Sequence, residues 1–187
     1  MIKQKNLKTD ILDRGWKILS EKGRESLRLR DLAKESGCSV GTIYNLFHNL
    51  DEIVLRLNIR SLDIMYSSLH KELNHEGSLE EVLNKLGKAY VQFGMKNPLI
   101  WKSLFENLAI VPFPQWYREK VDGGIEVIEK TLEKTYGLDA KKAHRIVSFF
   151  WAAIHGMTST MLNKKMEEVD EAYLNSYIDH CVRGIVG

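Results

Sequence analysis

Side chains that can hydrogen-bond to phosphates and base edges gather just after a turn signal. The stretch from Arg30 to Phe47 reads RDLAKESGCSVGTIYNLF. Gly37 falls where a short helix must end, because glycine adopts a positive φ at little cost, and Ser39 is a favourable N-cap for a second helix. This pattern is typical of a helix-turn-helix, so DNA is the first partner to consider. The candidate DNA contacts are Arg28, Arg30, Ser39, Val40, Gly41, Thr42, Tyr44, Asn45 and His48.

The second helix of this motif has one apolar side and one polar side. Val40, Ile43 and Phe47 recur at i, i+3 and i+7, so we expect them to face inward. Thr42 and Asn45 lie on the other side and carry groups that bond phosphates or base edges. The exposed N–H groups at the start of a helix attract phosphate as well.

Residues 1 to about 65 resemble the DNA-binding domain of TetR-family (TetR/AcrR) transcriptional regulators. The matching segments, in chain order, are ILDRGWKILSEKG, LRDLAKESG, CSVGTIYNLF and DEIVLRL. The resemblance implies that Tyr44 contacts phosphate and that Thr42 and Asn45 face the DNA.

Two positions depart from the pattern of that family. Leu50 stands where the family usually has Lys at the start of the fourth helix, and Arg28 stands where Thr or Ser usually opens the second helix. We therefore expect phosphate contact to shift to Arg28, Arg30 or His48.

The distribution of charge agrees with this placement. Residues 1–60 hold 12 Lys or Arg against 8 Asp or Glu, whereas residues 61–187 hold 15 against 17. Positive charge is thus concentrated where phosphate would bind, although chance variation over a solvated surface could give the same counts.

Several features exclude other classes of protein. No apolar run approaches the ~20 residues of a membrane span, and the N-terminal MIKQKNLKTD lacks the apolar region of a secretory signal. Cys38 and Cys181 lie far apart and form no metal-ligand pair. We therefore predict a cytoplasmic protein with no membrane partner, no metal and no cofactor.

Nearly the whole chain reads as helix, which predicts an all-α fold of about nine helices. Residues 1–50 are expected to form a three-helix helix-turn-helix domain, which continues into the start of the fourth helix to about residue 65. Residues 51–187 are expected to form a helical domain for ligand binding and dimerisation. Outside the motif, helices are expected at about 9–22, 49–73, 78–96, 98–108, 114–136, 139–165 and 170–185.

Local signals support these boundaries. Asn49 with Glu52 and Ser78 with Glu81 have the spacing of capping boxes. The adjacent glycines at 123–124 interrupt the seventh helix chemically. They indicate either a kink or a close approach of another segment.

The last two helices have the features of a dimer interface. The helix around residue 150 is apolar nearly all round its middle and needs cover on every side, which a second copy would supply. The resemblance agrees, because TetR-type regulators dimerise through these helices, and FWAAIHGMTS is similar to the Trp–His–Gly (WHG) subgroup signature at Trp151, His155 and Gly156. The candidate interface residues are His144, Val147, Ala152, Gly156, Leu174, Tyr177 and Cys181.

Aromatic residues concentrate in the sixth to eighth helices. Most are expected to be core, and some could line an apolar ligand cavity with polar anchors such as Ser148. His144 and His155 are eleven residues apart, too far for a metal pair, so each is expected to be a hydrogen-bonded interface or core residue. The candidate pocket residues are Tyr90, Trp101, Phe105, Asn107, Trp116, Tyr117, Phe150, Trp151 and His155.

These observations predict a DNA-binding transcriptional regulator. The sequence has no HExxH, GxxxxGK[ST] or GxSxG motif, so we predict no enzyme. We expect a homodimeric repressor that binds a palindromic operator and is released by an unknown small-molecule effector. The alternatives are a helical enzyme that uses the C-terminal cavity and a protein-interaction adaptor, which would not bind DNA with a steep salt dependence.

Overall fold

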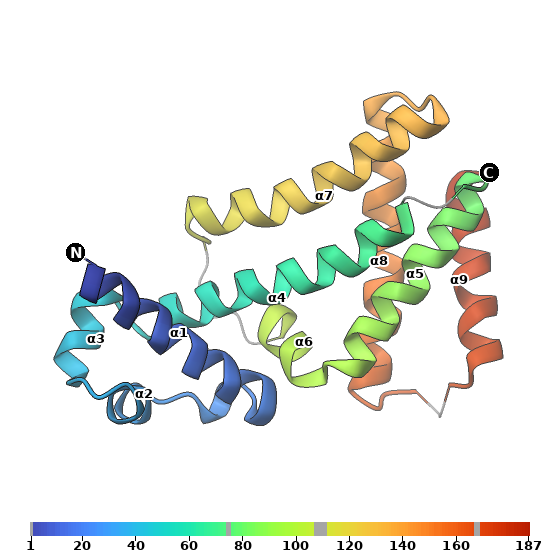
Figure 1. Cartoon of the computed structure of the whole chain (residues 1–187). Coiled ribbons are helices and arrows are strands. Elements are labelled where there is room, and N and C mark those ends of the chain that lie inside the picture. Colours follow the sequence, from blue (N-terminus) through green and yellow to red (C-terminus); the bar gives the residue numbers. More distant parts are fainter. Residues whose placement is uncertain (1, 74–75, 107–111, 167–168) are drawn as a thin grey trace. The chain divides into compact units, whose positions relative to one another are not determined.

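The computed structural model describes residues 2–73, 76–106, 112–166 and 169–187. Every regular element in these residues is helical, which confirms the all-α prediction (Figure 1). The elements are α1 (Ile2–Lys22), the 3₁₀ turn η1 (Arg24–Ser26), α2 (Leu29–Glu35), α3 (Val40–Leu46), α4 (Leu50–Leu73), α5 (Leu79–Lys96), α6 (Pro98–Phe105), α7 (Gln115–Tyr136), α8 (Ala140–Leu162) and α9 (Glu171–Val186). No helix of the described residues is long and apolar enough to cross a membrane.

The predicted capping signals begin these helices as expected. The Ser78 N–H donates to a Glu81 carboxylate oxygen at 2.8 Å, and the Glu81 N–H donates back to Ser78 Oγ at 3.2 Å. Asp139 and Asp170 cap α8 and α9 through their side chains. Such caps satisfy N–H groups that have no partner within the helix.

Two helix ends differ from the sequence prediction. The first helix begins at Ile2 rather than near residue 9, because the preceding residues IKQKNLK contain good helix formers and neither Gly nor Pro. The eighth helix ends at Leu162 rather than residue 165, since Lys164 adopts a positive φ of 52°. The predicted end of the sixth helix at Leu108 lies outside the described residues.

The chain packs as two compact units. The N-terminal unit comprises Met1–Asp63 and Asn97–Arg118, and the C-terminal unit comprises Ile64–Lys96 and Glu119–Gly187. Both α4 and α7 therefore contribute residues to both units. These units are defined by packing, and the predicted functional domains 1–50 and 51–187 remain predictions.

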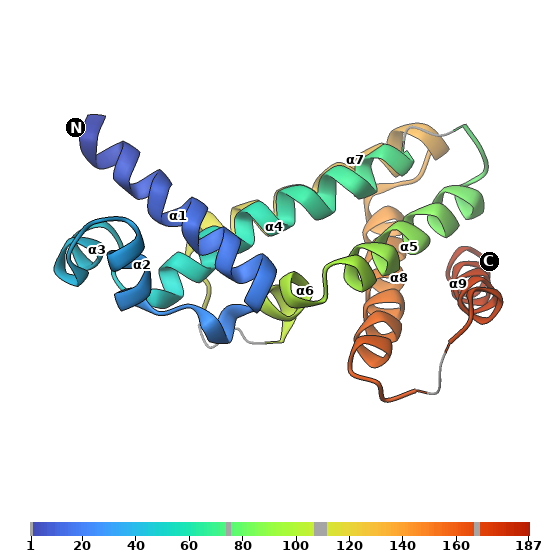
Figure 2. The same ribbon diagram turned by 60° about the horizontal axis from the view of Figure 1, so that its bottom comes forward.

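The N-terminal unit is built around one apolar cluster to which α1 to α4 contribute. Ile11 and Leu19 of α1, Leu32 of α2 and Ile43 of α3 are all buried in it. The C-terminal half of α1 also packs beside α6 (Figure 2). Bare backbone at Gly23 makes room for Leu99 there, since an added Cβ would lie 3.3 Å from the Leu99 side chain.

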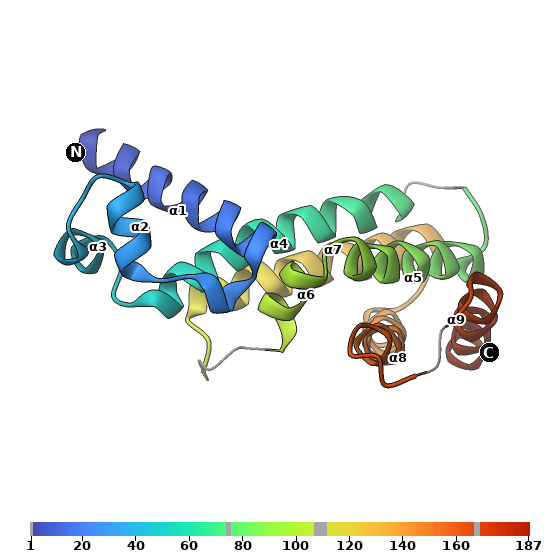
Figure 3. The ribbon, with the colours of Figure 1, turned by 90° about the horizontal axis from the view of Figure 1, so that it is seen from below.

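In the C-terminal unit, α5 packs on both α8 and α9. Figure 3 shows α8 and α9 nearly end-on with α5 lying across them. A Cβ at Gly87 of α5 would lie 2.9 Å from Ile178 of α9 and 3.3 Å from Phe150 of α8. The absence of a side chain at this position therefore lets three helices pack closely.

The pair Gly123–Gly124 lies inside a continuous α7 and marks a close approach. A Cβ at Gly124 would lie 2.1 Å from the ring of Tyr66, whereas the space around Gly123 is open. The Tyr66 hydroxyl donates to the Val121 carbonyl at 3.0 Å, which fixes the ring against α7.

Candidate nucleic-acid interface

The turn before α3 is built as the sequence predicts. Gly37 adopts a φ of 63°, and the Cys38 N–H donates to the Ala33 carbonyl at 3.0 Å, which closes the end of α2. Ser39 then caps α3, because its Oγ accepts from the Thr42 N–H at 3.1 Å. The hydroxyl oxygens of Ser39 and Thr42 are also hydrogen-bonded to each other at 2.9 Å. The start of α3 is therefore fixed before any partner binds.

The polar side of α3 faces solvent. Tyr44 is 53% exposed, and Gly41, Asn45 and His48 are exposed as well. Thr42 is half-buried. This face bears a phenol, an amide, an imidazole and a bare backbone position on one short helix and its flank.

Val40 lies differently from the other candidate contacts. Its side chain is half-buried and packs against the core cluster, beside Ile43 and Phe47. The inward face predicted for these three residues is thus present. Any contact of Val40 with DNA would be limited to its backbone and the exposed part of its side chain.

Two candidate arginines flank the motif on α2. Arg30 is exposed on the first turn. Arg28 is exposed at the N-cap position, and its guanidinium donates to the Leu27 carbonyl at 2.9 Å and to the Glu25 carbonyl. The Arg28 side chain therefore completes the η1 turn while its outer N–H groups stay accessible.

The start of α4 is held by a polar cluster. The Glu52 N–H donates to Asn49 Oδ1 at 2.8 Å, and the Glu52 carboxylate accepts from the His48 N–H at 2.9 Å. Arg56 pairs with the same carboxylate at 2.7 Å. Burial acts to raise the pKa of Glu52, but the bonds from His48 and Arg56 outweigh it and lower the pKa. Glu52 therefore stays ionised at neutral pH.

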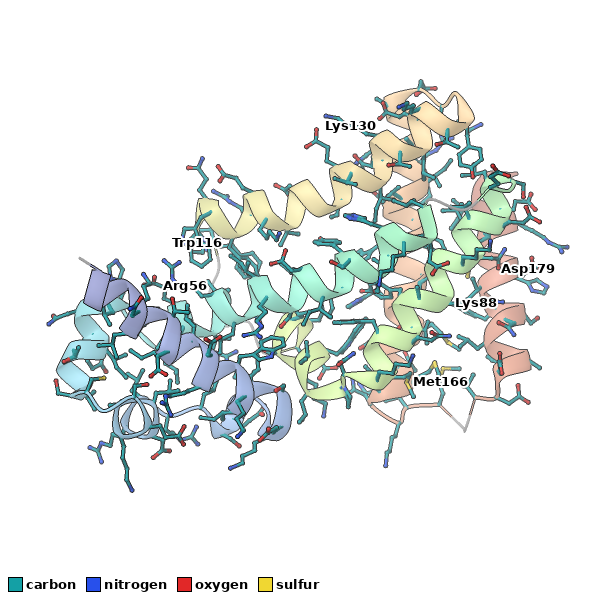
Figure 4. All side chains as sticks on the ribbon, in the orientation of Figure 1. Arg56, Lys88, Trp116, Lys130, Met166 and Asp179 are labelled. Carbon is teal, nitrogen blue, oxygen red and sulfur yellow. The ribbon has the colours of Figure 1, made fainter. Side chains whose placement is uncertain are left out.

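Arg56 also lies over an aromatic ring. Its guanidinium is 4.9 Å from the ring centre of Trp116 at the start of α7. Both side chains are labelled in Figure 4. Leu50, where the resembling family has Lys, is half-buried and packs on the core cluster. The first turn of α4 thus presents no cation of its own to a phosphate.

Sequence reasoning did not single out Lys8. Its Nζ lies 4.9 Å from the ring centre of Phe47, the residue that ends α3. The basic N-terminal segment was visible in the sequence, but nothing in the one-dimensional pattern shows that α1 brings Lys8 to the end of α3.

The candidate pocket residues are divided between the two units. Tyr90, Phe150, Trp151 and His155 belong to the C-terminal unit. The other described candidates, Trp101, Phe105, Trp116 and Tyr117, belong to the N-terminal unit. Asn107 lies outside the described residues.

Three of the C-terminal candidates contact one another. The Tyr90 hydroxyl and His155 Nδ1 are 2.9 Å apart, and the Trp151 ring stacks on His155 with centroids 4.8 Å apart. Burial raises the pKa of Tyr90, which keeps its hydroxyl neutral. Trp151 and His155 lie one helical turn apart on α8, and this spacing brings their two rings together.

The candidates of the N-terminal unit form separate contacts. Trp101 and Phe105 lie on α6 with ring centroids 4.6 Å apart. Trp116 packs edge-on against Tyr117 at 6.0 Å. Burial raises the pKa of Tyr117 to about 12, although its bond to Asn58 acts in the other direction.

The candidate dimer residues range from exposed to buried. Ala152 and Gly156 are exposed, whereas Val147 is buried in the chain's own core and offers little surface to a second copy. Leu174, Tyr177 and Cys181 are half-buried on α9, and the Tyr177 hydroxyl donates to the Ala153 carbonyl at 3.3 Å. The exposed His144 ring bonds Glu129 of α7 at 2.8 Å. No three His, Cys, Asp or Glu side chains among the described residues are placed to hold a metal ion.

Comparison with known proteins identifies the N-terminal motif. Residues 11–57 match the family model for bacterial regulatory proteins of the tetR family. An uncharacterized HTH-type transcriptional regulator of Haemophilus influenzae is 27% identical over 101 residues, which cover 52% of this chain and 54% of the relative. The chain thus spans about half the length of this relative.

Solved structures share the whole fold. A protein of unknown function from Rhodococcus sp. RHA1 superposes with a TM-score of 0.78 at 18% identity, covering 97% of this chain and 96% of its own. The regulator FadR from Bacillus subtilis, solved with stearoyl-CoA, has a TM-score of 0.65 at 15% identity, covering 96% and 97%. The matched family comprises transcriptional regulators rather than enzymes, in agreement with the sequence prediction.

Proposed function

We propose that this chain, a transcriptional regulator with a TetR-family DNA-binding domain, binds a palindromic operator as a homodimer and represses transcription until a small molecule releases it. The observation that carries the proposal is the exposed polar face of α3, with Tyr44 and Asn45 exposed opposite the buried Ile43. A helix with one face fixed in a core and the other presenting hydrogen-bonding groups is suited to a DNA groove.

Each α3 would lie in a major groove. Thr42 and Asn45 would read base edges, and the Tyr44 hydroxyl would bond a phosphate. Two such helices would contact half-sites roughly 34 Å apart, one helical turn of DNA. A protein with this function would act in the cytoplasm, where it reaches chromosomal DNA.

The dimer would form through α8 and α9. Phe149 of α8 is 58% exposed and Tyr173 of α9 is 52% exposed, so both helices present apolar surface to solvent in the single chain. On α8, the exposed Ala152 and Gly156 would let a second helix approach closely. Trp151, His155 and Gly156, which resemble the signature of the WHG subgroup, lie on the same helix.

The effector would bind in the C-terminal domain. Tyr90 and His155 supply polar groups next to the Trp151 ring, which suits a mostly apolar molecule with one polar end. FadR of Bacillus subtilis, which shares the fold, was solved with stearoyl-CoA, so a long-chain acyl-CoA is a reasonable first probe. To act as an inducer, the effector must bind the DNA-incompetent state more tightly than the DNA-bound state.

The DNA-binding face can be tested with two substitutions on α3. A duplex is first selected by the wild-type protein from a random-sequence library. Asn45→Ala is expected to cost about 1–3 kcal/mol of binding free energy and to relax sequence preference, and Tyr44→Phe to weaken binding to all sequences. The matched control is Asn84→Ala on α5, whose amide donates to the Glu80 carbonyl of its own helix.

The dimer fraction of each variant is measured by sedimentation, so that loss of dimer is not mistaken for loss of contact. Wild-type affinity in both α3 variants would show that the assigned face is wrong.

A further inference from the structure

Lys8 of α1 lies against the end of the recognition helix. Its Nζ is 4.9 Å from the ring centre of Phe47, which ends α3 and whose N–H donates to the Ile43 carbonyl at 2.8 Å. Phe47 is 1% exposed, so its ring is a fixed surface. A lysine ammonium over such a ring gains a cation–π attraction and keeps N–H groups free on its far side.

Several arginines of the N-terminal unit are, by contrast, paired with nearby carboxylates, whereas Arg28 lies at the N-cap of α2 and Arg30 lies on α2. Four arginines make ion pairs in this unit: Arg14 with Asp10 at 2.8 Å, Arg24 with Asp51 at 2.8 Å, Arg56 with Glu52 at 2.7 Å and Arg60 with Asp13 at 3.0 Å. Among the described side chains, no carboxylate lies within ion-pair distance of Lys8. The charge of Lys8 is therefore not cancelled by a partner.

The first turn of α4, which follows Phe47 closely, provides no alternative cation. Leu50 packs on the core cluster, and the carboxylates of Asp51 and Glu52 are held by Arg24 and Arg56. A DNA strand that passed the C-terminal end of α3 would be bound more tightly by positive charge at this point, because phosphates line both sides of the major groove.

We propose that Lys8 contacts a DNA backbone phosphate at the C-terminal end of α3, and that the Phe47 ring holds its ammonium in place for this contact. The inference rests on the proposed DNA-binding function and extends it to a residue of α1. Because a phosphate contact carries no sequence information, Lys8 contributes to affinity for every duplex and leaves sequence preference unchanged. A pre-positioned side chain loses less conformational freedom on binding than a free one.

The experiment compares Lys8→Gln with Lys17→Gln, which removes the same charge from an exposed position on the same helix. Affinity is measured between 50 and 200 mM salt, first for the duplex selected by the wild-type protein and then for a random-sequence duplex. One lost phosphate contact in each subunit of a dimer lowers the slope of log affinity against log salt by about 1.8. We expect this change for Lys8→Gln on both duplexes, with about tenfold weaker binding at 100 mM salt, and little change for Lys17→Gln.

Lys8→Arg is the rescue variant, because it keeps both the charge and the contact with the ring. We expect it to restore the wild-type slope. Circular dichroism checks that each variant is folded, and Lys8→Met provides a second neutral variant that retains an apolar stem over Phe47.

The outcomes separate this inference from the proposed function. A wild-type slope in Lys8→Gln, or an equal loss in Lys8→Gln and Lys17→Gln, overturns the contact while DNA binding stands. If the wild-type protein selects no duplex and binds none with a salt dependence, the proposed function itself fails.

Discussion

The surfaces of the two units differ in their exposed apolar side chains. In the described part of the N-terminal unit, the large apolar side chain that is well exposed is Tyr44, on α3. The described residues of the C-terminal unit include six such side chains: Ile64, Met95, Val127, Phe149, Trp151 and Tyr173. A surface with few well-exposed apolar side chains suits a polyanion, whereas a surface with more of them is better suited to a protein or ligand partner.

The interiors of the two units differ in their fully buried polar side chains. Of the four fully buried polar side chains in the part of the chain that the structure describes, three lie in the N-terminal unit (Asn58, Ser61 and Ser103) and one, Thr158, lies in the C-terminal unit. Asn58 and Ser103 bond each other between α4 and α6. The N-terminal unit thus joins α4 and α6 by a fully buried polar pair, whereas the C-terminal unit joins its helices through the hydroxyls of Tyr66, Tyr90 and Tyr177.

The difference between the two surfaces predicts its largest effect on the formation of the dimer. Ala152→Glu places a charge on the exposed apolar side of α8, where the two-fold symmetry of a dimer would bring it close to its own copy. A charge buried without a partner at such an interface costs several kcal/mol, so we expect the dimer dissociation constant to rise about 100-fold or more. Sedimentation velocity over a concentration series measures it.

Val127→Glu is the matched control for this substitution, since Val127 is 45% exposed on α7 of the same unit. It is expected to leave the dimer intact. A dimer that survives Ala152→Glu, or dissociates equally with Val127→Glu, would remove α8 from the interface and weaken the contrast between the two surfaces.

The next effect concerns the interior of the N-terminal unit. Asn58 Nδ2 donates to the Ser103 carbonyl at 2.8 Å, and Asn58 Oδ1 accepts from Ser103 Oγ at 2.7 Å. Asn58→Ala leaves both Ser103 groups without these bonds in the core, which is expected to lower the free energy of unfolding by about 3 kcal/mol. Urea unfolding at a fixed protein concentration measures the loss.

Ser61→Ala tests whether stability depends on a hydrogen bond that joins two helices or only on a buried polar side chain in the N-terminal unit. Ser61 is also fully buried, but its Oγ donates at 3.3 Å to the Leu57 carbonyl within its own helix. Its removal is expected to change stability by less than about 0.5 kcal/mol, because the Leu57 carbonyl keeps its backbone position and alanine favours helix. Equal losses in both variants would contradict a special role for the contact between α4 and α6.

Local signals in the sequence predicted most of the secondary structure. Ser39, Ser78, Asp139 and Asp170 cap helices because a side-chain oxygen reaches N–H groups two or three residues away, a contact decided within one turn. Gly37 ends α2 for an equally local reason. The helix-turn-helix was therefore predictable residue by residue, together with the exposed positions of Tyr44 and Asn45.

Contacts between helices were not predictable in this way. Periodicity shows that Trp101 and Phe150 are apolar helical residues, but it gives no information on which neighbouring helix each one meets, and the structure divides the predicted pocket between two units. The contact of Lys8 with Phe47 joins residues far apart in the chain, as does that of Tyr66 with Gly124. The adjacent glycines were recognised, but the choice between a kink and a close approach depended on a ring from another helix.

The smallest predicted effect separates those two glycines and tests packing in the C-terminal unit. A Cβ at Gly124 would lie 2.1–2.5 Å from three atoms of the Tyr66 ring, and the hydroxyl bond to Val121 opposes movement of that ring. Gly124→Ala is therefore expected to lower the free energy of unfolding by about 2 kcal/mol through overpacking. Gly123→Ala, in open space one residue away, should raise the free energy of unfolding by about 0.5–1 kcal/mol, since alanine favours helix over glycine.

Urea unfolding of both variants, and of Gly124→Ala combined with Tyr66→Ala, gives the coupling between positions 124 and 66. If Gly124→Ala is as stable as Gly123→Ala, the ring moves freely, and the C-terminal unit is looser than its apolar packing implies.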